Sequence, residues 1–400
     1  MLHTIYRIIR WPLLIAASVL LIVLARRVFM MPSVLHYDDF VEYWAAGRLI
    51  ITGGNPYDPE QILRLERAAG RPVEEAVMLW NPPWVLPLLV PFGLLPYPIA
   101  RILWFLLHLI ALAWGADRLG RMEAKSAASR WLPWIIAFTF APALEAVKAG
   151  QITSFMLPGL VGAMSAFPRH PFRAGLWSAL LLLKPHLAYL VLLTLLAESI
   201  RQRRPGFLLG LGVALTGASA LAALLNPMVF AQYLHAWRMY PPSEWATPTL
   251  GGILRLLLGP QRVALQFVPP LIGLGFWLHR IRHRPPSLPE LPMWTMLSLA
   301  TAAYGWTFDL TLAIAGLVPV FPRRPSPSLR WFGLILAYGL LNGILMFTSL
   351  PQIFYFWAGP AWLAWFLAAQ GAGASPASPR GSDAGGIAHA ARQGAAEGSR

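Results

Sequence analysis

The chain has 400 residues, of which 57% are hydrophobic and only 12% carry a charge. A soluble domain carries about 25% charged residues, so this composition indicates an integral membrane protein. The chain contains no cysteine, which excludes disulfides, thiolate catalysis and cysteine-based zinc sites.

The formal net charge is +15, from 32 Lys and Arg against 17 Asp and Glu. In a soluble protein this balance would suggest a nucleic-acid partner. Here the basic residues stand in short runs between apolar segments, around 201–204, 280–284 and 323–330. That arrangement follows the positive-inside rule, so we expect a lipid bilayer as the partner and no nucleic acid.

The first apolar segment runs from Trp11 to Ala25, after Arg7 and Arg10. It is similar to a signal peptide but lacks a small-x-small cleavage site, so we interpret it as an uncleaved first transmembrane helix. We therefore expect a multi-pass protein of a bacterial cytoplasmic (inner) membrane, with both termini inside.

The polar segment 31–78 then becomes the first external loop, and it is unusually acidic. It holds eight of the 17 acidic residues: Asp38, Asp39, Glu42, Asp58, Glu60, Glu66, Glu74 and Glu75. Residues 39–51 are typical of a short amphipathic helix, 53–59 of a turn, and 60–69 of a second short helix at the membrane interface.

The region between 79 and 206 has apolar segments near 80–96, 98–116, 131–147, 151–167 and 174–198. If the basic stretches 118–130, 169–173 and 201–204 all face the cytoplasm, Gly150-Gln151 and Lys184-Pro185 lie at the outer ends of short or broken helix pairs. A plain zigzag of five helices instead places two basic loops outside. The sequence leaves both arrangements open.

The C-terminal half has clearer spans, near 207–225, 262–279, 291–308, 310–322, 331–348 and 354–369. They leave 226–261 as a second external loop. Residues 371–400 are rich in Gly, Ala and Ser, which predicts a disordered cytoplasmic tail. We expect an all-α fold, a polytopic transmembrane bundle of about 10–13 helices that forms one domain over 1–370.

The doublet Asp38-Asp39 precedes the helix predicted in the first loop. An Asp pair at such a position most often caps the helix. Here Tyr43, Trp44 and Arg48 follow at helical spacing, so one face would combine a carboxylate, aromatic rings and a guanidinium. Because this face lies where the chain leaves the bilayer, it favours a substrate with a polar head and a lipid tail.

Four stretches carry a family resemblance: DDFVEYWAAGRLIITGGNPYD (38–58), WNPPWVLPLLVPFGLLPYPIAR (80–101), ALEAVKAGQITSF (143–155) and AGLWSALLLLKPHLAYL (174–190). In their order and spacing they resemble glycosyltransferase family 87, the polyprenyl-phosphate-mannose-type mannosyltransferases of the GT-C superfamily. The resemblance covers about 38–310.

The resemblance implies an inverting transfer of a hexose, mannose first, from a polyprenyl-phosphate sugar to a hydroxyl of a lipid or envelope glycan on the outer face. Such a reaction needs one base, which the family places in the first external loop. Asp39 is the first candidate for this base and Asp38 the second. The family often has His near Asp309, so Asp309 remains open between assisting catalysis, orienting sugar hydroxyls and capping a helix.

A leaving lipid phosphate needs cations or hydrogen-bond donors. Lys184, Arg48 and Arg255 are candidates, and a lysine inside an apolar run next to a proline favours a polar cavity there. Gln151 could bind sugar hydroxyls or cap a helix, and His186 could contact substrate or pack. The remaining substrate-binding candidates follow from the motifs that resemble the family: Tyr43, Asn55, Tyr57 and Asn81.

We expect no required metal or other cofactor, because a phosphomonoester-linked donor has less charge to neutralise than a diphosphate. A divalent ion on Asp38, Asp39, His36 or Asp309 is the alternative. Two other functions also stay open, a transporter or lipid flippase and a non-catalytic factor of envelope glycan assembly. Transporters usually bury ionisable groups near the midplane, whereas this chain gathers its acids in one loop, which favours an enzyme.

Overall fold

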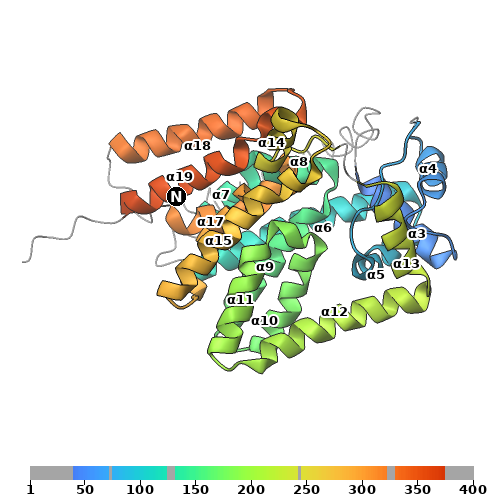
Figure 1. The fold of residues 1–400 in the computed structure, drawn as a ribbon, viewed down its shortest axis with the longest axis horizontal. Coiled ribbons are helices and arrows are strands. Elements are labelled where there is room, and N and C mark those ends of the chain that lie inside the picture. The colour runs from blue at the N-terminus through green and yellow to red at the C-terminus, as the bar shows by residue number, and fades with distance from the viewer. Residues whose placement is uncertain (1–38, 72–73, 124–130, 242–244, 322–328, 374–400) are drawn as a thin grey trace, which may run out of the picture.

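A computed structural model describes residues 39–71, 74–123, 131–241, 245–321 and 329–373 (Figure 1). Every regular element among these residues is a helix, which confirms the predicted all-α fold. The first apolar segment, Asp38, and the tail beyond residue 373 lie outside the described residues.

Three of the described helices are long and apolar enough to cross a membrane, namely α6 (Tyr97–Glu123), α12 (Pro205–Leu225) and α18 (Leu329–Phe347). A fourth span is formed if α7 (Leu132–Thr139) and α8 (Ala141–Ala149), bent by 56°, act together. α12 is only 11% buried within its most apolar window, as expected for a helix that faces lipid. Among the described residues, most of the other predicted spans are shorter helices or are interrupted.

The remaining helices of the central region are short. They are α5 (Leu86–Gly93), α9 (Met156–Ala166), α10 (Pro171–Ser178), α11 (Tyr189–Arg201), α16 (Leu291–Ala300), α17 (Ile314–Val320) and α19 (Ala358–Gly373). Short 3-10 turns join them: η1 (Pro83–Val85), η3 (Ile152–Phe155), η4 (Ala179–Leu183), η5 (Pro185–Leu187), η8 (Leu288–Glu290), η9 (Thr307–Ala313) and η10 (Gln352–Tyr355). Proline stands in the first turn of α7, α8, α10, α12, α15 (Val268–His283) and α16, where its missing N–H costs no helical hydrogen bond.

Three breaks between these helices meet inside the bundle. One follows Gly150, the left-handed C-cap of α8, and a second lies at Lys184, between η4 and η5. The third separates α16 from η9, which contains Asp309. Gly150-Gln151 and Lys184-Pro185 therefore lie at helix ends, as in the first of the two arrangements that the sequence left open. At Lys184 the reason is Pro185, which disfavours helical geometry in the residue before it.

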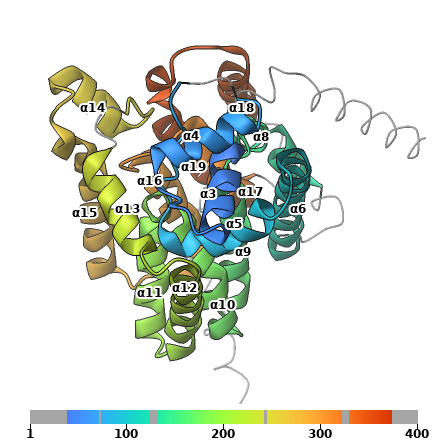
Figure 2. The same cartoon turned by 90° about the vertical axis from the view of Figure 1, so that its right-hand side faces the viewer.

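The helix α3 (Phe40–Ile51) was predicted to be amphipathic and to lie at the surface. The structure contradicts this prediction, because ten of its twelve residues are buried. In the end-on view it lies among α4 (Pro59–Ala68), α5 and α6 (Figure 2). The crossing with α5 is very close: a Cβ on Gly47 would lie 2.4 Å from the carbonyl oxygen of Leu89, so only glycine fits there. α4 begins with an Asp cap, since the Asp58 side chain accepts a hydrogen bond from the Gln61 N–H.

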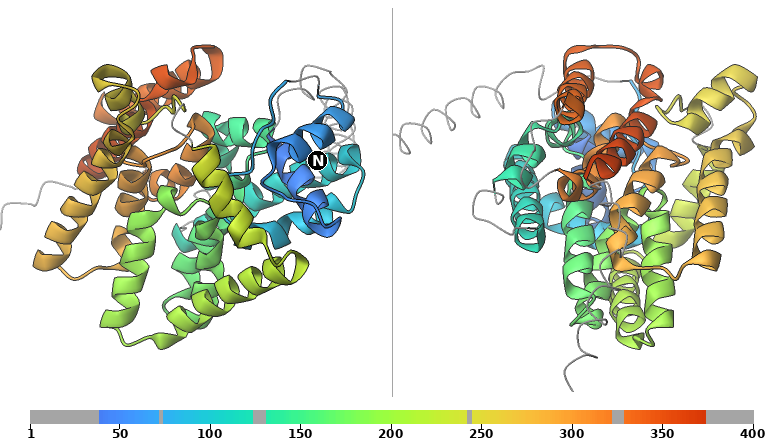
Figure 3. Two further views of the ribbon diagram at one scale, coloured as in Figure 1. Left: turned by 45° about the vertical axis from the view of Figure 1, so that its right-hand side comes forward. Right: turned by 90° about the vertical axis from the view of Figure 1, so that its left-hand side faces the viewer.

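The segment predicted as a second external loop contains two helices, α13 (Val229–Met239) and α14 (Leu250–Leu258). It is followed by η7 (Val263–Phe267) and α15 (Val268–His283). α18 and α19 lie side by side at the opposite side of the molecule from α10 and α12 (Figure 3). α19 continues to Gly373, so the predicted tail begins at least three residues later than expected.

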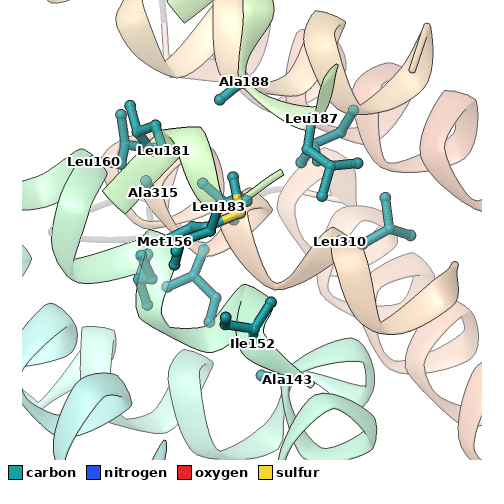
Figure 4. Packing of buried hydrophobic residues seen from close by; sticks show 14 of the residues in the cluster. Ala143, Ile152, Met156, Leu160, Leu181, Leu183, Leu187, Ala188, Leu310 and Ala315 are labelled. Carbon is teal, nitrogen blue, oxygen red and sulfur yellow. The ribbon is translucent and has the colours of Figure 1, made fainter. Parts of the chain in front are cut away.

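Buried apolar side chains pack directly behind the three helix breaks (Figure 4). Ile152 follows Gln151, Leu183 precedes Lys184, and Leu310 follows Asp309, and each is at most 7% exposed. Each polar residue is thus next in sequence to a side chain anchored in the core. This packing restricts the backbone at all three breaks.

Candidate active site

A cavity of about 670 Å³ lies where the three breaks and α3 meet. We call it the central cavity. It is lined by Asp39, Glu42, Tyr43, Ala76, Val77, Met78, Trp80, Asn81, Pro82, Gln151, Leu183, Lys184, Pro185, His186, Tyr233, Trp237, Trp245, Tyr304, Gly305, Trp306, Phe308, Asp309 and Gln352. The structure therefore brings together residues from the whole span between 39 and 352.

Asp39 stands at the N-cap position of α3, but its side chain makes no capping hydrogen bond. Its Oδ2 instead accepts a hydrogen bond of 2.6 Å from Nε2 of Gln151. The Asp39 N–H donates to the carbonyl oxygen of Ala149 at 2.8 Å, which joins the start of α3 to the end of α8. The carboxylate is thus turned away from its own helix and toward the cavity, so the capping interpretation does not describe it.

Gly150 makes this junction possible. Its φ of +69° is a left-handed conformation that favours glycine, and a Cβ there would lie 2.8 Å from Cβ of Phe40. Its carbonyl oxygen accepts a hydrogen bond of 2.7 Å from the buried Trp104 indole. The turn therefore places Gln151 beside Asp39.

Lys184 joins two of the other polar residues. Its Nζ donates to Oε1 of Gln151 at 2.9 Å and to Oδ1 of Asp309 at 2.8 Å, and it lies 5.1 Å from the centre of the Phe308 ring. These contacts agree with the prediction of a polar cavity at this lysine. Lys184 is paired inside the bundle and does not extend to the membrane interface.

Asp309 is held by three donors and is 2% exposed. Oδ1 accepts from Lys184 and, at 2.5 Å, from Thr153, while Oδ2 accepts from the backbone N–H of Trp306 at 2.9 Å. The bond to Trp306 is a helix cap, one of the three predicted roles. The same carboxylate also forms the ion pair, so one oxygen fixes the backbone and the other fixes Lys184.

Burial changes the proton affinity of several cavity groups. Burial raises the pKa of Asp39, although the hydrogen bond from Gln151 and the charge of Lys184 oppose that rise. Glu42, one turn along α3, has its pKa raised well above the usual range by burial and then by the charge of Asp39. Burial lowers the pKa of His186 to about 4, so its imidazole is neutral at pH 7.

Aromatic rings form one wall of the central cavity. Trp80 makes edge contacts with Trp237 and Trp245, with ring centres 5.6 and 5.2 Å apart. Trp245 and His186 in turn contact Tyr304, at 6.1 and 6.4 Å. Rings from four distant segments thus line the same space as the carboxylates.

Several predicted site residues do not line the central cavity. Arg48 donates to the Gly93 carbonyl oxygen, Asn55 accepts from the Tyr57 N–H, and the Tyr57 hydroxyl donates to the Asn81 carbonyl oxygen. The Arg255 guanidinium binds the Pro260 carbonyl and Oε1 of Gln266. These hydrogen bonds support nearby loops. Substrate binding by these four residues stays a prediction, because none of them lines the cavity.

Asn81 and His186 do line the cavity as predicted. The Asn81 side chain also donates to the Leu183 carbonyl oxygen at 2.9 Å, and Trp84 donates to that of Leu182, so both satisfy carbonyls that the helix break frees. Glu145, which does not line the cavity, accepts hydrogen bonds from the cavity residue Gln352 and from Thr307.

Glu42, Trp80 and Tyr304 are cavity residues that sequence reasoning did not select. Glu42 stands three positions after Asp39, so helical spacing alone places it on the same side of α3. Trp80 opens one of the four motifs, but its neighbours in space lie more than 150 positions away, and the sequence holds no signal for them.

No three His, Asp or Glu side chains come close enough to hold a metal ion within the parts of the chain that the structure describes. The absence of a required metal therefore stays a prediction. Whether or not a metal ion binds, the cavity contains a carboxylate with raised proton affinity, a fixed cation and flat apolar ring faces in a partly enclosed space.

A family model named glycosyltransferase family 87 matches residues 79–341 of the chain. The chain belongs to glycosyltransferase family 87. Family 87 membership confirms the resemblance seen in the sequence, and the chain is a membrane glycosyltransferase. The match includes Gln151, Lys184 and Asp309 but begins after Asp39, so the role of Asp39 rests on the geometry of the cavity. No curated protein and no solved structure matches the chain.

Proposed function

We propose that this family 87 enzyme transfers a hexose, mannose first, from a polyprenyl-phosphate sugar to a hydroxyl of a lipid or envelope glycan on the outer face of a bacterial cytoplasmic membrane. The observation that carries the proposal is the arrangement of Asp39 and Lys184 in one cavity, joined through the side chain of Gln151. The base can take the proton of the attacking hydroxyl, and the cation can stabilise the leaving phosphate.

In the proposed reaction the acceptor oxygen forms a bond to the anomeric carbon while the bond from that carbon to the phosphate oxygen breaks. The acceptor proton passes to Asp39, and the bonding pair leaves with the polyprenyl phosphate. Oδ1 of Asp39 accepts no hydrogen bond from the described residues, which leaves it open for this proton. Attack opposite the leaving group inverts the anomeric centre.

Lys184 is the proposed contact for the departing phosphate. An ammonium group has three N–H donors, and Gln151 and Asp309 take two of them. The third can donate to a phosphate oxygen without breaking the ion pair. Because Asp309 already balances the charge of Lys184, the lysine would act mainly as an oriented donor until negative charge develops on the phosphate.

The aromatic wall supports a sugar and a lipid chain as ligands. Flat Trp and Tyr faces pack against the C–H faces of sugar rings and against isoprenoid chains. The wall formed by Trp80, Trp237, Trp245 and Tyr304 borders His186, two positions from Lys184. A donor with its phosphate on Lys184 would therefore have both its sugar and its first isoprenes near aromatic rings.

The proposed side of the membrane rests on where the basic residues lie. The helices α9 and α11 both start beside the cavity, at Met156 and Tyr189, and both end at a basic cluster. Arg204 of that cluster donates to the Phe167 carbonyl at the end of α9, and Arg201 lies in the last turn of α11. At about 1.5 Å per residue, α11 separates the two ends by roughly 20 Å. If the basic end faces the cytoplasm, the cavity at the other end of these helices lies toward the outer face.

The proposal can be tested with purified protein in lipid nanodiscs. Radiolabelled polyprenyl-phosphate-mannose is supplied with a bacterial lipid extract as acceptor, and GDP-mannose replaces it in a parallel reaction. We expect labelled glycolipid only from the lipid-linked donor. Transfer from GDP-mannose and none from the lipid-linked sugar would contradict the donor class, and transfer from neither would contradict the mannose assignment.

A further inference from the structure

The side-chain amide of Gln151 has only one orientation that its neighbours allow. Its Oε1 receives the Tyr43 hydroxyl at 3.0 Å and the Lys184 ammonium at 2.9 Å. An ammonium group carries donors and no acceptor, so the amide atom that faces it must be the oxygen. The amide nitrogen therefore faces Asp39, at 2.6 Å.

Burial and backbone hydrogen bonding hold the side chain of Gln151 in this position. The residue is 6% exposed, its N–H donates to the Ala146 carbonyl at 2.9 Å, and Ile152 beside it is fully buried. Tyr43 is also fully buried. A rotated amide would set its oxygen against the Asp39 carboxylate and its nitrogen against the Lys184 ammonium, which are two repulsive contacts.

The geometry points to Gln151 as a positioning residue for the base, and not as the sugar-binding residue predicted from sequence. It holds Asp39 in the ionised form, directs Oδ1 toward the acceptor, and ties this arrangement to Lys184. The inference rests on the proposed function for the roles of Asp39 and Lys184. The hydrogen-bond network itself does not depend on which sugar is transferred.

The physical consequence is a difference in the proton affinity of Asp39. A hydrogen bond donated to a carboxylate favours its charged form, so its loss raises the pKa. Hydrogen bonds to charged groups contribute about 1.5–3 kcal/mol, which corresponds to a rise of about one to two pH units. The other charged groups near Asp39 are Glu42 on the same helix, Glu66, Lys184, Asp309 and Arg71, and a substitution at Gln151 replaces none of them.

The test measures protonation of Asp39 directly in the full-length protein without substrate. Infrared pH-difference spectra in nanodiscs report the C=O stretch of each protonated carboxyl group, and Asp39→Asn identifies the Asp39 band. We expect its midpoint to rise by about one to two pH units in Gln151→Leu. In Gln151→Glu, which keeps the shape of the side chain and can still accept from Lys184 and Tyr43, the introduced carboxyl and Asp39 lie within hydrogen-bonding distance and share one proton. We expect this pair to lose its shared proton at a pH at least as high as in Gln151→Leu, because the two ionised carboxylates repel each other.

Ser154→Ala is the matched control. Ser154 is buried three positions further along the chain and bonds His108, and neither residue lines the cavity. Its loss should leave the Asp39 midpoint within about 0.3 pH units of the wild type, within the precision expected for an independent site. An unchanged midpoint in both Gln151 variants would overturn the inference, as would an equal shift in Ser154→Ala.

An activity measurement separates failure of this inference from failure of the proposed function. If the wild type transfers sugar, the acidic limb of its kcat profile should move to higher pH in Gln151→Leu by the same amount as the infrared midpoint, with KM for the donor nearly unchanged. A purely structural loss would lower kcat equally at all pH values. If the wild type transfers no sugar, the proposed function fails while the infrared result still decides the role of Gln151.

Discussion

The ammonium of Lys184 lies 2.8 Å from Oδ1 of Asp309, across 125 positions of sequence, and both side chains are largely buried. The pair joins the break after η4 to the start of η9 and lies on the wall of the central cavity. Removing one partner of such a pair leaves the other charge buried without compensation, which lowers the free energy of unfolding. The pair therefore both fixes the fold around the cavity and keeps a cation in it.

Replacing one member of this pair should destabilise the protein strongly. We expect Lys184→Met to lower the free energy of unfolding by about 3–5 kcal/mol, because Asp309 stays buried without its cation. Thermal unfolding in detergent measures the effect. Lys184→Met combined with Asp309→Leu should be less destabilised than the sum of the two single variants.

The matched control for that experiment is the exposed pair of Arg121 and Asp117, whose side chains are 67% and 40% exposed. Arg121→Met should change the free energy of unfolding by less than about 1 kcal/mol. Equal effects of Lys184→Met and Arg121→Met would contradict the importance of the buried pair.

The rate of transfer should depend on pH through Asp39. A base must be ionised to act, and burial raises the pKa of Asp39, so activity should rise with a midpoint above the ordinary aspartate value of about 3.9. His186, with a pKa of about 4, is neutral above that pH and should add no limb near pH 7. Rates measured between pH 4 and 8 test this, and a rate that does not fall as the pH is lowered to 4 would be incompatible with it.

Glu42 should affect stability in the opposite sense from a salt-bridged carboxylate. Because its pKa in the folded state is raised, its contribution to stability is present at low pH and is lost as pH rises through that pKa. Glu42→Gln should therefore stabilise the protein at pH 7–8 by roughly 1 kcal/mol and have little effect near pH 4. Melting temperatures at the two pH values provide the comparison; a lower melting temperature of the variant at pH 8 would speak against a buried, poorly compensated carboxyl group.

Gly150 should tolerate no side chain. A left-handed conformation costs an ordinary residue about 1–2 kcal/mol, and here a Cβ would also meet Phe40. Gly150→Ala should lose at least this much stability and reduce the rate of transfer, because it displaces Gln151 from Asp39. Gly212, whose Cβ would meet nothing within 4 Å, provides the control, and Gly212→Ala should be neutral or slightly stabilising. Equal stability of the two variants would argue against a special role for this turn.

Much of the cavity could be predicted from the chain alone, for identifiable reasons. Gln151 and Lys184 stand beside residues that interrupt helices, Gly150 and Pro185, and such interruptions in apolar segments signal polar cavities. Asp309 stands between two apolar segments. These signals are local in sequence, which is why they located three residues that meet in space.

Other features depend on packing that is not local. The pattern of residues 39–51 resembles an amphipathic helix, but Gly47 of α3 and Gly93 of α5 let the two helices cross closely enough to bury α3. Arg48 and Arg255 looked like phosphate ligands because they are cations near the motifs. Their side chains instead bind backbone carbonyls, a choice that depends on chain segments 5 to 45 positions away.

The most direct test of the proposed active site compares two aspartates at equivalent helix starts. Asp39 precedes α3 and lines the cavity, whereas Asp58 precedes α4 and caps it. Initial rates of sugar transfer from polyprenyl-phosphate-mannose are measured for the wild type, Asp39→Asn and Asp58→Asn. We predict a loss of about 10²-fold to 10⁴-fold for Asp39→Asn, the usual contribution of a general base, and less than a few-fold for Asp58→Asn. An Asp39→Asn variant that is as active as Asp58→Asn would contradict the assignment of Asp39 as the base.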